Sequence, residues 1–134
     1  MSTRLKRTMR AGFLAAVIGG VPSTVYGLAR GDDPFESTRA VGSMVTSTTD
    51  DSTLLMAAVP IHLGISLGWA AVIAGVLPAR RRLLFGALMG VGIAMLDLRV
   101  LGRSFPRIRA LALGPQVADH VAFAMIVAAL TQPH

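Results

Sequence analysis

Hydrophobic and polar positions divide this chain into four long apolar segments joined by shorter polar stretches. The clearest segment, 54–77, carries no charged side chain and is longer than the roughly 20 residues that a membrane-spanning helix requires. The other three segments cover about 11–29, 83–101 and 116–131. The pattern therefore predicts an all-α, polytopic membrane protein, in which residues 1–134 form a single domain, a four-helix transmembrane bundle.

The polar stretches carry start and stop signals for short helices. Asp33–Glu36 places Asp, Pro and Glu where a helix begins, with Asp33 as the N-cap, which predicts a short interfacial helix over about 34–45. A second short interfacial helix is expected within 102–116, ending at Gly114–Pro115. The tract 46–53 is a loop that supplies an N-cap for the second span.

Charge differs sharply between two of the connections. Residues 30–53 contain two arginines and five acidic side chains, whereas residues 99–116 contain four arginines and no acid. If both connections lie on one side of the membrane, two interpretations follow. They pack together, or each meets water and lipid headgroups separately, because exposed ion pairs contribute only about 0–1 kcal/mol.

Composition narrows the classes of function. Hydrophobic residues make up 53% of the chain and the mean hydropathy is +0.62, as expected for a domain whose solvent is lipid. The absence of cysteine excludes disulfides, thiolate metal sites and cysteine nucleophiles. The formal charge of +6 does not indicate a nucleic-acid partner, because the arginines flank apolar spans instead of lining one face.

Basic residues also bear on orientation. Residues 1–10 carry four, the turn 80–82 carries three, and the two other connections carry six between them. The compact position of the first seven beside the spans favours a multi-pass plasma-membrane protein with cytoplasmic N- and C-termini. The alternative for the first segment is a cleaved signal peptide, with Gly27-x-Ala29 as the cleavage site.

Small residues recur at helical spacing in the spans, where they allow helix backbones to approach closely in lipid. Pro22 is expected to kink the second half of the first span. The expected partners are the lipid bilayer and either a second copy of the chain or another membrane protein. Helix packing is assigned to Gly12, Gly19, Gly64, Gly68, Gly86 and Gly90.

The two halves of the chain resemble each other. Gly12, Ala16 and Ser23 align at one constant offset with three residues of the third span, Gly86, Gly90 and Asp97. His62 and His120 likewise stand near the start of the second and fourth spans. Duplication of a hairpin is one explanation, and chance matching of apolar sequence is the other.

Ionisable and polar side chains inside the apolar segments are the candidates for function, because burying them in lipid is costly. A closed hydrogen-bonded cluster that fixes helix register is one interpretation. The other is a cavity in which Asp97 and His62 relay protons or bind a small ligand or cation. The candidate ligand or proton-site residues are Asp97, His62, Ser66, Asp119, His120, Ser23 and Tyr26.

Other chemistry lacks support in the pattern. His62 and Ser66 are spaced to pair on one helical face, yet no Gly-x-Ser-x-Gly elbow accompanies them. His62, Asp119 and His120 lack the close spacing of a metal site. We therefore expect no metal, no cofactor and no enzymatic activity.

Four short segments are similar to those of a group of small uncharacterised four-span membrane proteins of actinobacteria. They are GVPST at 20–24, STRA at 37–40, HLGISLGW at 62–69 and ADHVAF at 118–123. The resemblance extends along almost the whole chain and implies a four-span membrane fold, but it carries no assigned activity. The expected function is that of an accessory or scaffold protein acting through helix packing. The alternative is a small transporter or proton/ion pathway centred on Asp97 and His62.

Overall fold

The computed structural model describes residues 1–132, and over these residues it is helical with no strand. Four helical segments are long and apolar enough to cross a membrane, which confirms the predicted all-α bundle. They run over Thr3–Arg30, Asp51–Val76, Arg82–Ser104 and Leu113–Leu130.

The first span is two helices, α1 (Thr3–Ile18) and α2 (Val21–Arg30), separated by Gly19 and Gly20. The predicted kink is therefore a complete break, and it lies just before Pro22. This proline occupies the first turn of α2, where a missing backbone N–H has no helical acceptor to lose. At the other end, Ser2 extends the helix beyond the predicted start, because its side chain accepts the N–H of Leu5 at 3.2 Å.

The second span, α4 (Asp51–Val76), starts as the polar tract predicts. The side chain of Asp50 caps it by accepting the backbone N–H of Thr53 at 2.9 Å. Leu77 ends it in an extended conformation directly before Pro78, which cannot continue a helix. The predicted N-cap before this span and the predicted end before Pro78 are thus both confirmed.

The third span changes its helical form along its length. It begins as α5 (Arg82–Ala94), continues as a π-helix, η1 (Met95–Leu101), and ends in a short 3-10 turn, η2 (Gly102–Ser104). Asp97 lies in the first turn of η1. Such π segments are rare and occur frequently at functional sites.

The two short helices are present and are shorter than expected. Helix α3 covers Glu36–Gly42, and Phe35 is its N-cap residue. The prediction of Asp33 as N-cap is wrong in detail, because its carboxylate accepts the N–H of Phe35 at 2.8 Å in a turn before the helix. Helix α6 covers Pro106–Ala110.

The prediction that Gly114–Pro115 ends the second short helix is also wrong. Helix α6 ends at Ala110, and Gly114–Pro115 lies in the first turn of the fourth span, α7 (Leu113–Leu130). A proline is accepted there for the same reason as in α2. The earlier start places Asp119 and His120 well inside the span instead of at its edge.

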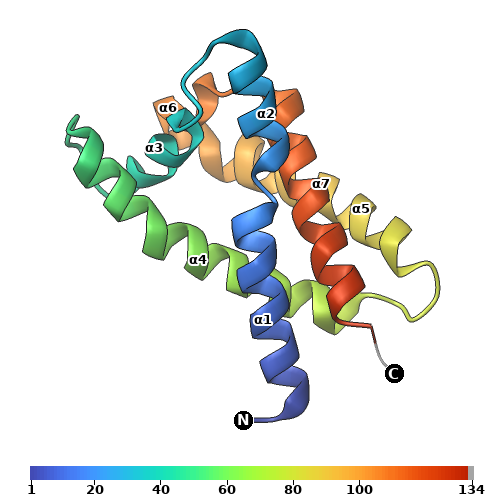
Figure 1. Ribbon diagram of the computed structural model, residues 1–134. Helices are drawn as coiled ribbons and strands as arrows, with labels where there is room; N and C mark the ends of the chain where they lie inside the picture. Colours follow the sequence, from blue (N-terminus) through green and yellow to red (C-terminus); the bar gives the residue numbers. More distant parts are fainter. Residues whose placement is uncertain (133–134) are drawn as a thin grey trace.

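Helix α7 is the centre of the bundle, because it packs against α1, α2, α4 and α5. Figure 1 shows the N-terminus, the end of α7 and the α4–α5 turn at one end of the molecule, with α3 and α6 at the other. Helix α4 leans away from α5 and packs along α1 and α3. One long face of α4 is therefore left without a neighbouring helix.

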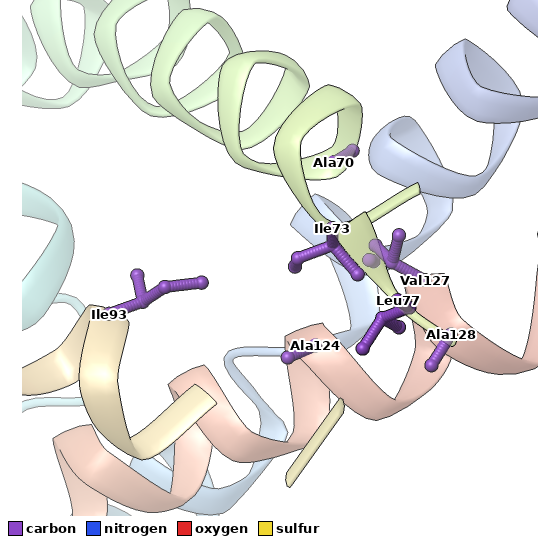
Figure 2. Close-up of a cluster of buried hydrophobic side chains, with 8 residues drawn as sticks. Ala70, Ile73, Leu77, Ile93, Ala124, Val127 and Ala128 are labelled. Atoms are coloured by element: carbon purple, nitrogen blue, oxygen red, sulfur yellow. The ribbon is translucent and has the colours of Figure 1, made fainter. Parts of the chain in front are cut away.

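Small side chains dominate the buried core between the helices. Ala15 of α1, Ala70 of α4, and Ala124 and Ala128 of α7 have essentially no exposed surface. Figure 2 shows the larger Ile73, Leu77 and Val127 close to Ala70, Ala124 and Ala128, while Ile93 of the same buried cluster lies farther away on α5. Close approach of backbones is what stabilises helices in lipid, where apolar burial between helices gives little gain.

The same close contact occurs once in each half of the chain. A Cβ on Gly12 would lie 2.7 Å from the Cβ of Ala70, and a Cβ on Gly86 would lie 2.9 Å from that of Ala128. His62 precedes Ala70 by the same number of residues as His120 precedes Ala128. This correspondence is what a duplicated hairpin produces, and the duplication stays a prediction.

Candidate functional site

Asp97 is held by two side chains from two other spans. The indole Nε1 of Trp69 on α4 donates to its Oδ2 at 3.0 Å. The imidazole Nε2 of His120 on α7 lies 3.6 Å from the same oxygen. The carboxylate thus joins the second, third and fourth spans at one point.

His120 is oriented by its other ring nitrogen. Its Nδ1 lies 2.7 Å from the backbone carbonyl of Gln116, one turn earlier in α7. A carbonyl oxygen only accepts hydrogen bonds, so Nδ1 carries a proton. In a neutral ring Nε2 then has a lone pair facing Asp97. Nε2 and the Asp97 carboxylate form an ion pair only when Nε2 carries a proton as well.

The break in the first span is closed by side chains from two other helices. The backbone N–H of Ser23, in the first turn of α2, donates to Oδ1 of Asp119 at 2.7 Å. On the α1 side, Nε2 of His62 lies 3.0 Å from the carbonyl oxygen of Ala16. Because helix ends leave backbone groups without intrahelical partners, each of these two contacts satisfies one group that the break exposes.

The seven predicted polar candidates do not form one site. Asp97 and His120 meet, and Asp119 and His62 meet the broken helix, but His62 is not bonded to Asp97. The hydroxyl of Ser23 donates to the carbonyl oxygen of Gly20, the residue before its own helix. Ser66 is buried on α4, beside the core.

Tyr26 lies away from this cluster. It is 40% exposed, and the guanidinium of Arg30 stands 5.4 Å from its ring centroid. This stacking is typical of a side chain at a membrane surface.

The six glycines assigned to packing divide into two groups. A Cβ on Gly12, Gly19, Gly86 or Gly90 would lie within 3.1 Å of an atom of a neighbouring helix. At Gly64 and Gly68, a Cβ would meet no described atom within 4 Å. The first group packs inside the bundle, and the second lies on the open face of α4.

The two charged connections pack together at the end opposite the N-terminus. Arg107 of α6 lies 3.5 Å from a carboxylate oxygen of Glu36 on α3, and the Gln116 amide donates to Ser37 at 2.8 Å. The guanidinium of Arg39 is largely buried and pairs with the carboxylates of Asp33, Glu36 and Asp51. The first of the two interpretations of these connections is therefore the one found.

This ion-pair cluster changes the titration of Asp33. The backbone N–H of Phe35 and then the Arg39 guanidinium stabilise its charged form, which lowers the pKa of the carboxyl below its ordinary value. Asp33 is solvent-exposed, so the effect on stability is screened and small.

Two side chains matter more than the sequence pattern indicates. Trp69 lies on the same helical face as His62, which is the signal that could have identified it as a donor to Asp97. Arg82 is buried at the start of α5 and donates to backbone carbonyls of Leu77 and Ala128. In the sequence it is one of three consecutive arginines, which together indicate a basic surface turn and give no sign that Arg82 is buried.

Over residues 1–132, no group of three or more His, Asp or Glu side chains converges as metal ligands do. The chain matches no protein-family model, no curated protein and no solved structure. The geometry of the polar cluster and of the open α4 face is therefore the basis for a functional proposal.

Proposed function

We propose that this protein is a membrane accessory or scaffold protein that self-associates through α4. The observation that carries the proposal is the open face formed by Gly64, Gly68 and Gly75. A Cβ at any of them would meet no described atom within 4 Å, so packing inside the chain does not require glycine there. Glycine nevertheless destabilises a helix by roughly 1 kcal/mol relative to alanine. In lipid, such a small-xxx-small face allows a second helix to approach closely.

A second copy of the chain suits this face best. Two copies inserted in the same orientation and related by a two-fold axis along the membrane normal present identical faces to each other. The same glycines then supply both sides of the contact. Within the chain, α4 packs against α1, α3 and α7 through other positions.

The polar cluster supports this function by holding α4 in place. His62 fastens α4 to the broken first span through Ala16, and Trp69 fastens it to the third span through Asp97. Because these two hydrogen bonds lie at different positions along α4, together they fix both its rotation about its own axis and its position along that axis. A fixed rotation keeps the glycine face turned outward.

The test uses two differently tagged copies expressed together. Self-association predicts that either tag recovers both copies after solubilisation in mild detergent. A Gly68→Cys variant should form a disulfide between copies, whereas Gly92→Cys on α5, which is equally open, should not. Recovery of one copy alone, together with no cross-linking at Gly68→Cys, contradicts the proposal.

A second candidate, a proton pathway, is supported by the contact between Asp97 and His120. Nε2 of His120 and Oδ2 of Asp97 lie 3.6 Å apart, so a small approach of the two side chains would let a proton pass between them. Asp119 directly precedes His120 in α7, so the adjacent residue carries a second carboxyl group. Vesicles with an internal pH dye test this: proton entry with the native chain that Asp97→Asn abolishes supports the pathway, and absence of any flux contradicts it.

A further inference from the structure

A pocket of about 200 Å³ lies where the third span ends and α7 begins, beside the packed α3–α6 connections. Three arginines line it, and each comes from a different element: Arg99 from η1, Arg103 from η2 and Arg109 from α6. Gln116 of α7 completes the polar part of the lining. The π-helix and the 3-10 turn thus bring together charges from residues ten positions apart in the sequence.

These three arginines differ from the other arginines at this end of the molecule. Arg30, Arg39 and Arg107 each lie within 4 Å of an acidic side chain. Over residues 1–132, Arg99, Arg103 and Arg109 have no carboxylate partner, and no acidic side chain lines the pocket. Guanidinium groups stay protonated at every physiological pH, so the pocket concentrates like charges that repel one another.

We propose that this pocket binds a phosphate group. The planar fork of a guanidinium matches the oxygens of a phosphate and can bond to two of them at once. A bound phosphate places negative charge among the three arginines and removes their mutual repulsion. The volume exceeds that of several water molecules, which is ample for such a group.

A lipid headgroup is the source that the surroundings favour. The pocket lies at the end of a span, at the level where headgroup phosphates meet a membrane protein. Leu98, Leu111 and Leu113 line its apolar side, next to the exposed Val100 and Leu101, and offer a surface for acyl chains. Basic pockets between membrane helices bind lipid phosphates by this combination.

The test measures lipid binding to the purified full chain in detergent by native mass spectrometry. The probes are phosphatidylglycerol, a diacylglycerol with the same acyl chains but no phosphate, and inorganic phosphate. We expect phosphatidylglycerol to bind at least about tenfold more tightly than diacylglycerol. The pocket variant Arg103→Gln/Arg109→Gln should lose that preference.

A matched control removes two charges elsewhere. Arg10→Gln/Arg80→Gln lowers the net charge equally, but both residues lie outside the pocket. It should bind phosphatidylglycerol as the native chain does. A second variant, Arg103→Lys/Arg109→Lys, keeps the charge and loses the fork, and we expect it to bind several-fold more weakly than the native chain.

The outcomes separate the sources of phosphate. Loss of lipid binding in the pocket variant, without competition from inorganic phosphate, supports a lipid headgroup site. Competition by inorganic phosphate that the pocket variant abolishes supports a site for a soluble phosphate compound. Equal binding by the native chain, the pocket variant and the lysine variant shows diffuse attraction only and overturns the proposal.

Discussion

The backbone N–H of Ser23 donates to the carboxylate of Asp119 at 2.7 Å, although 96 positions separate the two residues. Ser23 lies in the first turn after a break in the first span, and Asp119 lies inside the fourth. In lipid no water is present to satisfy the freed N–H group. The carboxylate therefore accepts a hydrogen bond from the first turn of α2, as an N-cap side chain does at the start of a helix in water.

This contact predicts different effects for two substitutions of Asp119. Asp119→Leu leaves the Ser23 N–H without an acceptor and should destabilise the fold by about 1–3 kcal/mol. Asp119→Asn keeps an accepting oxygen and should cost much less. Thermal unfolding in detergent measures both. Equal loss of stability in the two variants would show that the charge, and not the cap, is what the fold requires.

Two glycines on α5 provide a matched pair of positions that tests the close approach of α5 to α7. A Cβ on Gly90 would lie 2.6 Å from the Cα of Val121, whereas one on Gly92 would meet no described atom within 4 Å. Gly90→Ala should therefore push α5 away from α7 and destabilise the bundle by about 1–3 kcal/mol. Gly92→Ala should be neutral or stabilise it by up to about 1 kcal/mol, because alanine favours the helix. Similar unfolding temperatures for both variants would contradict the close approach of α5 and α7.

Acid should loosen α3 through Asp33. Its pKa is lower in the folded chain than in the unfolded chain, because the Phe35 N–H and Arg39 stabilise the carboxylate. The associated stability is present above the unfolded pKa, near about 4, and is lost as the pH falls through the folded value. NMR titration of the Asp33 carboxyl carbon should therefore give a midpoint below about 4. A midpoint at or above this value would mean that the ion pair does not form.

Hydropathy predicts the four spans well because lipid excludes charged groups from a membrane-spanning segment whatever its neighbours in the fold are. Local rules predict the Asp50 cap and the end of α4 before Pro78, since only neighbouring residues are involved. The pairing of Arg107 with Glu36 follows from opposite charge in two connections. In each case the decisive interaction is local, or it depends on charge alone.

The break at Gly19–Gly20 and the π-helix around Asp97 depend on contacts between distant residues. A Gly-Gly pair is tolerated inside a membrane helix, and it becomes a break here because His62 and Asp119 bond to the freed backbone. The sequence places His62 and Asp97 together as candidates, but helix rotation decides that Asp97 meets His120. Such rotations are set by packing that no local pattern records.

Trp69 is the sole tryptophan, so its fluorescence reports directly on Asp97. Negative charge beside the indole N–H stabilises the excited state, in which electron density moves away from the pyrrole ring. Asp97→Leu should therefore shift the emission to shorter wavelength. Asp51→Leu, at the exposed start of α4, is the control and should leave the emission unchanged. An unchanged spectrum in Asp97→Leu would mean that the indole does not donate to this carboxylate.

The most direct test of self-association is the mass of the detergent-solubilised particle, measured by sedimentation with the detergent density-matched. Gly64→Leu/Gly68→Leu fills the open face of α4, where a Cβ meets no described atom within 4 Å, and Gly92→Leu adds the same side chain at an equally open position of α5. We expect two copies per particle for the native chain and for Gly92→Leu, and one copy for the α4 variant. A single copy for the native chain, or two copies for all three proteins, would contradict association through α4.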